Sequence, residues 1–224
     1  MAFATAWGVL VAWAVVSFTA LEQVWPRRPG RPGWRRIALA AALLAIDAAI
    51  ARLVIRDDPA PRPVLRIVIA WLIMETLMYG VHRAMHRVAW LWRFHRLHHA
   101  DLPLSWATAW ISHPFDAALF ASCAALGGWL AGASPAGAVG FVVARRAWTL
   151  LLHANVAWPA SALDQVIATP AFHDRHHCEH LPPANFASSL PVLDLVFGSY
   201  RGSDRISARS SDRGIDRAPA QPTL

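Results

Sequence analysis

Three short motifs contain most of the histidines in this sequence. Of the eleven histidines, eight lie in the boxes His82-Arg83-Ala84-Met85-His86, His95-Arg96-Leu97-His98-His99 and His173-Asp174-Arg175-His176-His177. On a helix, residues three and four positions apart share one face, so each box presents two or three imidazoles together. Neutral imidazole is a common ligand of zinc, copper, iron and nickel. Because one ion rarely takes more than four such protein ligands, eight histidines suit two ions.

A single H-x-x-x-H pair on a helix is more often an ordinary surface or core pair than a metal site. Here two of the three boxes repeat the spacing H-x-x-H-H, and apolar segments surround all of them. This repetition favours a metal site over a chance arrangement. His153, at the predicted end of a helix, and His180, three residues after His177, are the expected additional ligands. For His113, which precedes Pro114, a structural hydrogen bond is the simpler interpretation.

The composition indicates a membrane protein. Apolar residues make up 56% of the 224 residues and charged residues only 16%, whereas about a quarter is charged in soluble proteins. Residues Met1–Leu21 carry no charge and are long enough to span a bilayer. A signal peptide would have a basic start and a shorter apolar stretch, so we predict a retained anchor.

Further apolar segments predict an all-α fold, an integral-membrane bundle of about four transmembrane helices. Ile37–Ile55 and Ile67–Val81 are two spans, and a helical hairpin follows, with one arm over Phe115–Ala133 and the other from Ala136 to about Val156. Ionisable residues inside spans are costly and usually face the bundle interior. This expectation applies to Asp47, Glu75, Arg145 and Arg146.

Arginine sets the predicted orientation, because the sequence contains no lysine. The link between the first two spans holds Arg27, Arg28, Arg31, Arg35 and Arg36, and the next link holds Arg56, Arg62 and Arg66. Positive residues favour the cytoplasmic side, so the first link is predicted to be cytoplasmic. Counting spans then places all three boxes on the cytoplasmic face. The net charge of +7 is spread over loops beside spans, which indicates anionic headgroups, and no nucleic-acid partner is expected.

The remaining features concern domain organisation. Residues 1–200 are predicted to form one membrane-embedded domain, and the polar residues 201–224 a disordered tail. The two cysteines, Cys123 and Cys178, do not suggest a disulfide framework. Cys178 follows the third box and is interpreted as a neighbour of the site without a ligand role.

From about residue 71 to 200 the sequence resembles the fatty acid hydroxylase and sterol desaturase superfamily, which comprises integral-membrane di-iron enzymes. The motifs that carry the resemblance are the three boxes, Trp92-Arg93-Phe94, His113-Pro114-Phe115-Asp116, His153-Ala154-Asn155, Pro170-Ala171-Phe172, Asn185-Phe186, Leu190, Asp194 and Phe197-Gly198-Ser199-Tyr200. The sequence departs from the family pattern at Gly80-Val81, Ile111, Ala187 and Leu193. None of these departures lies in a box.

The resemblance implies two iron ions that activate dioxygen against an unactivated C–H bond, giving an alcohol or, after a second abstraction, an alkene. The implied catalytic residues and metal ligands are the box residues His82, His86, His95, His98, His99, His173, His176 and His177. His153 and His180 are further ligands, and zinc is a possible occupant because imidazole alone does not select iron. The implied location is a bacterial inner membrane with the metal site facing the cytoplasm.

The implied substrate is a membrane lipid, with fatty acyl, sterol-like, carotenoid and ornithine-lipid classes all open. The sequence has no Gly-rich dinucleotide fingerprint and no C-x-x-C-H haem motif. Electrons are therefore expected from a separate ferredoxin or cytochrome with its reductase. Two other classes stay open, namely a zinc-dependent or other non-oxygenase membrane enzyme of the same fold and a non-catalytic metal-binding membrane protein.

Overall fold

The computed structural model describes residues 2–29, 33–54, 64–100, 103–130, 132, 145–159, 162–178 and 181–202. Within these ranges the regular structure is helical, and the one isolated antiparallel bridge joins Pro26 to Val156. The predicted all-α class is thus confirmed for this part of the chain.

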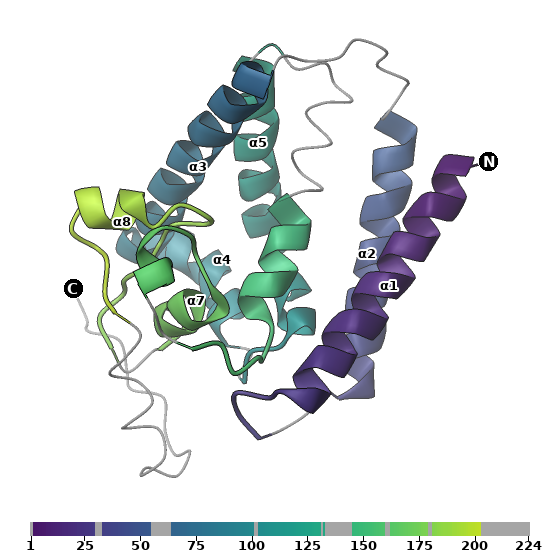
Figure 1. Cartoon of the computed structure of the whole chain (residues 1–224). Helices are drawn as coiled ribbons and strands as arrows, with labels where there is room; N and C mark the ends of the chain where they lie inside the picture. Colours follow the sequence, from purple (N-terminus) through teal and green to yellow (C-terminus); the bar gives the residue numbers. More distant parts are fainter. Residues whose placement is uncertain are drawn as a thin grey trace.

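Four long helices run alongside one another: α1 (Ala2–Val24), α2 (Trp34–Val54), α3 (Val64–Arg87) and α5 (Pro114–Leu130) (Figure 1). Helix α1 packs against α2, and α3 packs against α5. At Gly127 of α5 a Cβ atom would lie 3.0 Å from the Cα atom of Met74 in α3. Glycine therefore permits the close approach of these two helices.

Short elements gather at the end of the bundle where α1 and α3 finish and α5 begins (Figure 1). They are α4 (Ala89–His99), the 3-10 helices η1 (Trp106–Trp110) and η2 (Ala162–Gln165), α7 (Pro170–His176) and, beside α3, α8 (Val192–Val196). A further helix over residues 145–153 leads to the same end.

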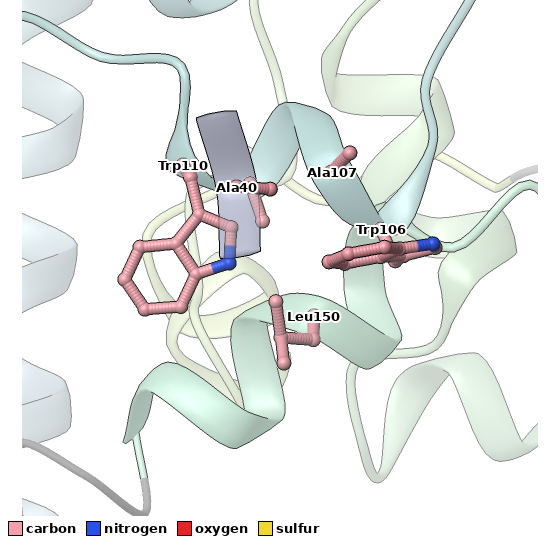
Figure 2. Packing of buried hydrophobic residues seen from close by; sticks show 6 residues of the cluster. Ala40, Trp106, Ala107, Trp110 and Leu150 are labelled. Carbon is pink, nitrogen blue, oxygen red and sulfur yellow. The ribbon is translucent and has the colours of Figure 1, made fainter. Parts of the chain in front are cut away.

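The buried apolar side chains of the described residues form three clusters. In one cluster, Trp106 and Trp110 of η1 pack against Ala40 of α2 and Leu150 of the helix over residues 145–153 (Figure 2). A second cluster joins Tyr79, Leu152, Phe172 and Phe186, and a third joins Met74, Met78, Cys123 and Ala124. These clusters fix the relative positions of the elements that carry the histidines.

Among the described residues, one helix, Val64–Arg87, is both long and apolar enough to cross a membrane. Two shorter apolar stretches are Val15–Val24, which belongs to α1, and Pro114–Leu130, which is α5. The bundle of about four spans therefore stays a prediction.

Several predicted features fall partly or wholly outside the description. The first arm of the hairpin corresponds to α5, and Gly132 follows it with a φ of 72°. Residues 133–144, residues 203–224 of the tail and the ligand candidate His180 lie outside the described residues. The domain boundary at residue 200 likewise stays a prediction.

Candidate metal centre

Four helical segments bring nine histidines together. Helix α3 contributes His82 and His86, α4 contributes His95, His98 and His99, the helix over residues 145–153 ends at His153, and α7 with its C-cap contributes His173, His176 and His177. The structure thus gathers all eight box histidines together with His153.

The nine histidines divide into two groups. Within each group, one nitrogen from every ring lies within 4.8 Å of the others. The first group is His82, His86, His95, His99 and His176, and the second group is His98, His153, His173 and His177. Each cluster has enough imidazole nitrogens to hold one metal ion, and the number of ions stays a prediction.

Local sequence explains how the helices present these rings. In α4 the histidines His95, His98 and His99 are buried while Arg93 and Leu97 are exposed, as expected of an amphipathic helix. At the start of α7 the side chain of Thr169 accepts a hydrogen bond from the backbone N–H of Phe172 at 3.2 Å, and Pro170 occupies the first turn.

The outer ring nitrogens are anchored to acceptors. The Nδ1 atoms of His82, His98, His153 and His176 lie 2.8, 3.2, 2.9 and 2.8 Å from the backbone oxygens of Phe186, Ile111, Thr149 and Ala184 respectively. A carbonyl oxygen only accepts, so each Nδ1 carries the proton. In a neutral imidazole, Nε2 is then left with a free lone pair.

The inner nitrogens of His98 and His153 consequently face each other without a proton between them. Their Nε2 atoms are 2.9 Å apart. Burial lowers the pKa of His98 to about 4, so an extra proton on this ring is disfavoured at neutral pH. Metal–nitrogen distances of about 2.0–2.1 Å place two ligands of one ion roughly 3 Å apart. The donor atoms therefore fit a shared cation.

In the first group, too, the inner ring nitrogens lie close to one another. The Nε2 atoms of His176 and His99 are 3.1 Å apart, and those of His99 and His95 are 3.2 Å apart. Burial lowers the pKa of His176 to about 3. The buried Nε2 atom of His86 has no hydrogen-bond partner among the described residues, and a metal ion would satisfy it.

A loop that the sequence analysis did not interpret supports both His82 and His176. Asn185 lies between the two accepting residues, Ala184 and Phe186, and has a positive φ of 59°. Its side-chain amide donates to the backbone oxygens of Phe172 and Arg201 at 3.1 and 3.0 Å. The motif Asn185-Phe186 was identified only through the resemblance, because a backbone carbonyl acceptor has no side-chain signature.

Asp194 holds the other side of this loop. Its two carboxylate oxygens accept hydrogen bonds from the backbone N–H groups of Phe186 and Ala187 at 2.9 and 2.8 Å. The hydroxyl of Ser199 donates to the same carboxylate at 2.6 Å. The C-terminal motif around Asp194 thus positions the carbonyl group of Phe186, which accepts the hydrogen bond from His82.

Other polar residues near the boxes have distinct roles. Asp116 accepts from Nδ1 of His95 at 3.1 Å, as expected of a carboxylate that orients a metal ligand. His113 accepts a hydrogen bond from the backbone of Phe115 at 3.1 Å and belongs to neither histidine group. Cys178 is buried and donates to the backbone oxygen of Asp174 at 3.3 Å, again outside both groups. Because they point off the ligand face, the arginines inside the boxes are predicted to meet lipid headgroups, but Arg175 is buried in the protein, so this prediction is wrong for Arg175.

A cavity opens beside the two groups between α3, α5 and the helix over residues 145–153. Both groups reach it, with His82 and His95 from the first and His98, His153 and His173 from the second. Much of its wall is apolar, including Ala117, Phe120, Ala121, Ala124 and Leu152. The site therefore has apolar access next to its nitrogen donors.

Arg145 and Arg146 also line this cavity. Arg145 donates to the hydroxyl of Ser188 at 2.5 Å and to the sulfur of Met78 at 3.2 Å. The guanidinium of Arg146 lies 4.9 Å from the ring centroid of Trp110. Glu75 is fully buried and accepts from the backbone of Ser189 at 2.7 Å. Glu75 and Arg145 thus face the protein interior, as predicted.

Comparisons with known proteins relate the chain to one family. The model of the family described as fatty acid hydroxylase matches residues 67–199. The ornithine lipid hydroxylase OlsE of Rhizobium tropici is 31% identical over 153 residues, covering 67% of this chain and 45% of the relative.

Two other relatives carry different names. A putative methylsterol monooxygenase of Dictyostelium discoideum is 26% identical over 68% of this chain and 56% of its own length. A very-long-chain aldehyde decarbonylase of Oryza sativa subsp. indica is 27% identical over 65% of this chain and 25% of its own length. The chain thus spans about half or less of these relatives. No solved structure matches the chain.

Proposed function

This chain belongs to the fatty acid hydroxylase family, and from that premise we propose that it is a membrane-bound di-iron oxidoreductase. The proposed reaction is hydroxylation or desaturation of a lipid C–H bond, with dioxygen as oxidant and electrons from a separate protein. The names of the bacterial and Dictyostelium relatives, a lipid hydroxylase and a methylsterol monooxygenase, support a lipid substrate.

The observation that carries the proposal is the pair of opposed lone pairs on His98 and His153, 2.9 Å apart. Hydrogen bonds to Ile111 and Thr149 fix both Nδ1 protons, so this contact is repulsive without a cation. Preorganised, buried and neutral imidazoles are the state in which histidine binds transition metals.

Iron bound by the two groups would supply the redox chemistry that activates dioxygen. The protein's own residues do the rest. Asp116 orients the ring of His95, and the carbonyl oxygens fix four other rings. The apolar wall at Phe120, Ala121 and Ala124 excludes water and admits an alkyl chain or ring beside the metal ligands.

The test is oxygen incorporation by membranes that contain the full chain. Membranes are supplied with ¹⁸O₂, reductant and a ferredoxin–reductase system, and the extracted lipids are analysed by mass spectrometry. We expect a labelled alcohol, or an unlabelled alkene that forms only with dioxygen. His98→Ala should abolish either product, whereas His113→Ala, a histidine outside both groups, should retain it. Product formation without dioxygen would refute the oxygenase assignment.

One alternative has specific support. Imidazole ligands also suit zinc, and one relative is named an aldehyde decarbonylase rather than a hydroxylase. A zinc-dependent, oxygen-independent enzyme of the same fold is therefore the second candidate. Metal analysis of protein purified without oxygen separates the two, since the proposal requires about two iron equivalents per chain and the alternative requires zinc that sustains turnover.

A further inference from the structure

The end of α1 and the turn after it contact the metal centre from outside the family match. The family match begins at residue 67, whereas residues 22–28, which we name the N-terminal clamp, lie well before it. The clamp touches α7, the segment after His153 and η1 through polar contacts. Each of these three elements either carries or supports a histidine of the second group.

The first contact is an ion pair inside the third histidine box. Arg28 donates to both carboxylate oxygens of Asp174, with Nη1 at 2.6 Å and Nη2 at 3.0 Å. Arg27 adds a third contact to the same carboxylate at 3.2 Å. The side chain of Asp174 is only 5% exposed, and it directly follows His173 in α7. A bidentate arginine on a buried carboxylate fixes orientation as well as distance.

The second contact fixes the segment that follows His153. The backbone N–H of Arg28 donates to Oδ1 of Asn155 at 3.0 Å, and Nδ2 of Asn155 donates back to the carbonyl of Arg28 at 3.0 Å. The backbone of Arg27 donates to the carbonyl of Asn155 at 3.2 Å. Asn155, whose amide makes both bonds, lies two positions after His153, so the position of His153 depends on the clamp.

The third contact is made by Glu22, which is buried. One of its carboxylate oxygens accepts from the backbone N–H groups of Asn155 at 2.9 Å and of Trp106 at 2.6 Å. Trp106 begins η1, and the residue after η1, Ile111, provides the carbonyl that accepts from His98. Glu22 therefore connects the supports of His153 and His98, the two rings with opposed lone pairs.

The first histidine group is supported differently. His82, His95 and His176 rest on Phe186, Asp116 and Ala184 respectively, which all lie within the family match. Among the described contacts, those of the clamp reach the first group only through elements that both groups share, namely α7 with His176 and α4 with His95 and His99. The structure is therefore asymmetric, with the clamp directed at the second group.

We propose that residues 22–28 are a positioning element for one metal ion of the pair, the ion bound by His98, His153, His173 and His177. This inference rests on the proposed metal centre and adds that an N-terminal element outside the matched region controls occupancy of one site. Arg28 touches no reacting atom and acts through Asp174 and Asn155.

The test is a metal titration of the metal-free, full-length protein in detergent, with ferrous iron added under anaerobic conditions. The wild-type protein should bind two equivalents. In Arg28→Gln we expect one equivalent to bind as in wild type and the other to bind about 10- to 100-fold more weakly, the usual range for loss of an orienting partner. Arg35→Gln, an exposed arginine of the same link, is the matched control and should bind both equivalents normally.

Double variants assign the weakened site. Combined with His153→Ala, which removes a ligand of the second group, Arg28→Gln should cause little further loss. Combined with His86→Ala, it should weaken the remaining ion as well. If Arg28→Gln does not fold, Arg28→Lys takes its place. Lysine keeps the positive charge but cannot make the two parallel hydrogen bonds of the guanidinium, so the same selective loss is expected.

Two results would overturn the inference. One is normal binding of both ions by Arg28→Gln, and the other is equal weakening of both ions in a variant whose circular dichroism is unchanged. If the wild-type protein itself binds fewer than two equivalents, the proposed function fails together with the inference.

Discussion

Asn185 is the residue on which the orientation of two rings depends most directly. Its left-handed backbone turns the neighbouring carbonyls of Ala184 and Phe186 toward His176 and His82. Asparagine tolerates this conformation better than other non-glycine residues, and its amide satisfies buried carbonyls that a glycine would leave unpaired. Both the backbone geometry and the side-chain hydrogen bonds therefore explain why an asparagine occupies position 185.

Replacing Asn185 should separate these two contributions. Asn185→Ala loses the side-chain hydrogen bonds and keeps a strained φ, so we expect a loss of about 2–3 kcal/mol in the free energy of unfolding. Metal affinity should fall by about 10- to 100-fold. Asn185→Gly relieves the strain but not the lost bonds, so it should lie between alanine and wild type. Thermal unfolding and metal titration measure both effects, and an alanine variant equal to wild type would contradict this account.

The buried histidines also predict how the metal-free protein responds to acid. Burial lowers the pKa of His98 to about 4 and that of His176 to about 3, from the ordinary 6.5. The unfolded chain therefore binds more protons than the native state between pH 6.5 and about 4, so stability falls as the pH falls through this window. The expected slope approaches about 1.4 kcal/mol per pH unit for each histidine.

Unfolding midpoints measured from pH 7 to pH 4.5 in the presence of a chelator check this expectation. His98→Gln removes one of these two titrating histidines and should reduce the slope of stability against pH. If the metal-free protein is equally stable at both ends of the range, the histidines are not held neutral by the fold.

At this scale the sequence predicted which histidines meet but not the backbone oxygens that orient most of them. Spacing of three and four residues is a local property of helices, so His82 with His86 and His95 with His99 could be paired from the sequence. Convergence of the boxes was reached only by counting spans. Four of the outer nitrogens have backbone oxygens as partners, and Phe186 lies 104 residues from His82. Such acceptors are defined by tertiary structure.

The α3–α5 pair sets the geometry of the first group, because α3 carries His82 and His86 while α5 begins beside Asp116. At Gly127 the two backbones are so close that an added Cβ would meet Met74 at 3.0 Å. The new atom would meet the backbone N and Cα atoms and the Cβ atom of Met74, which cannot move away as the end of a flexible side chain could. Any larger residue here must therefore move one helix.

Gly127→Ala is expected to destabilise the protein by about 1–3 kcal/mol and to weaken metal binding in the first group. Gly80→Ala is the matched control, because Gly80 is an exposed helical glycine with nothing within 4 Å of its added Cβ. That substitution should be neutral or stabilise by about 0.5–1 kcal/mol. Thermal unfolding of both variants in detergent gives the comparison, and equal midpoints would show that the α3–α5 contact is not limiting.

Helices that a long apolar stretch marks in the sequence were predicted, whereas an element whose place depends on tertiary packing was not. The predicted spans Ile67–Val81 and Phe115–Ala133 correspond to α3 and α5. The 3-10 helix η1 was not predicted, since residues 106–110 have no periodic pattern. Its position follows from burial of Trp106 and Trp110 against α2, which is a long-range contact.

At the scale of the whole molecule, the structure links the first loop to the third box. Arg28 binds Asp174, so the turn after α1 and the histidine box in α7 lie at the same end of the bundle (Figure 1). The sequence had placed both on one side by counting spans and arginines. The ion pair is independent of that counting, because it does not depend on how many helices cross the bilayer.

The side of the membrane is the final prediction, and it follows from arginine distribution together with this contact. Five arginines between the first two apolar segments against three in the next link favour a cytoplasmic position for the clamp. Since Arg28 holds Asp174, the metal centre must follow the clamp to the same side, where a soluble electron donor can reach it. Reporter fusions at Ala60 and Arg205 should read outside and cytoplasm respectively. The reverse pattern would place the metal centre outside, and two cytoplasmic readings would mean that an even number of segments, rather than the predicted three, crosses the bilayer between residues 60 and 205.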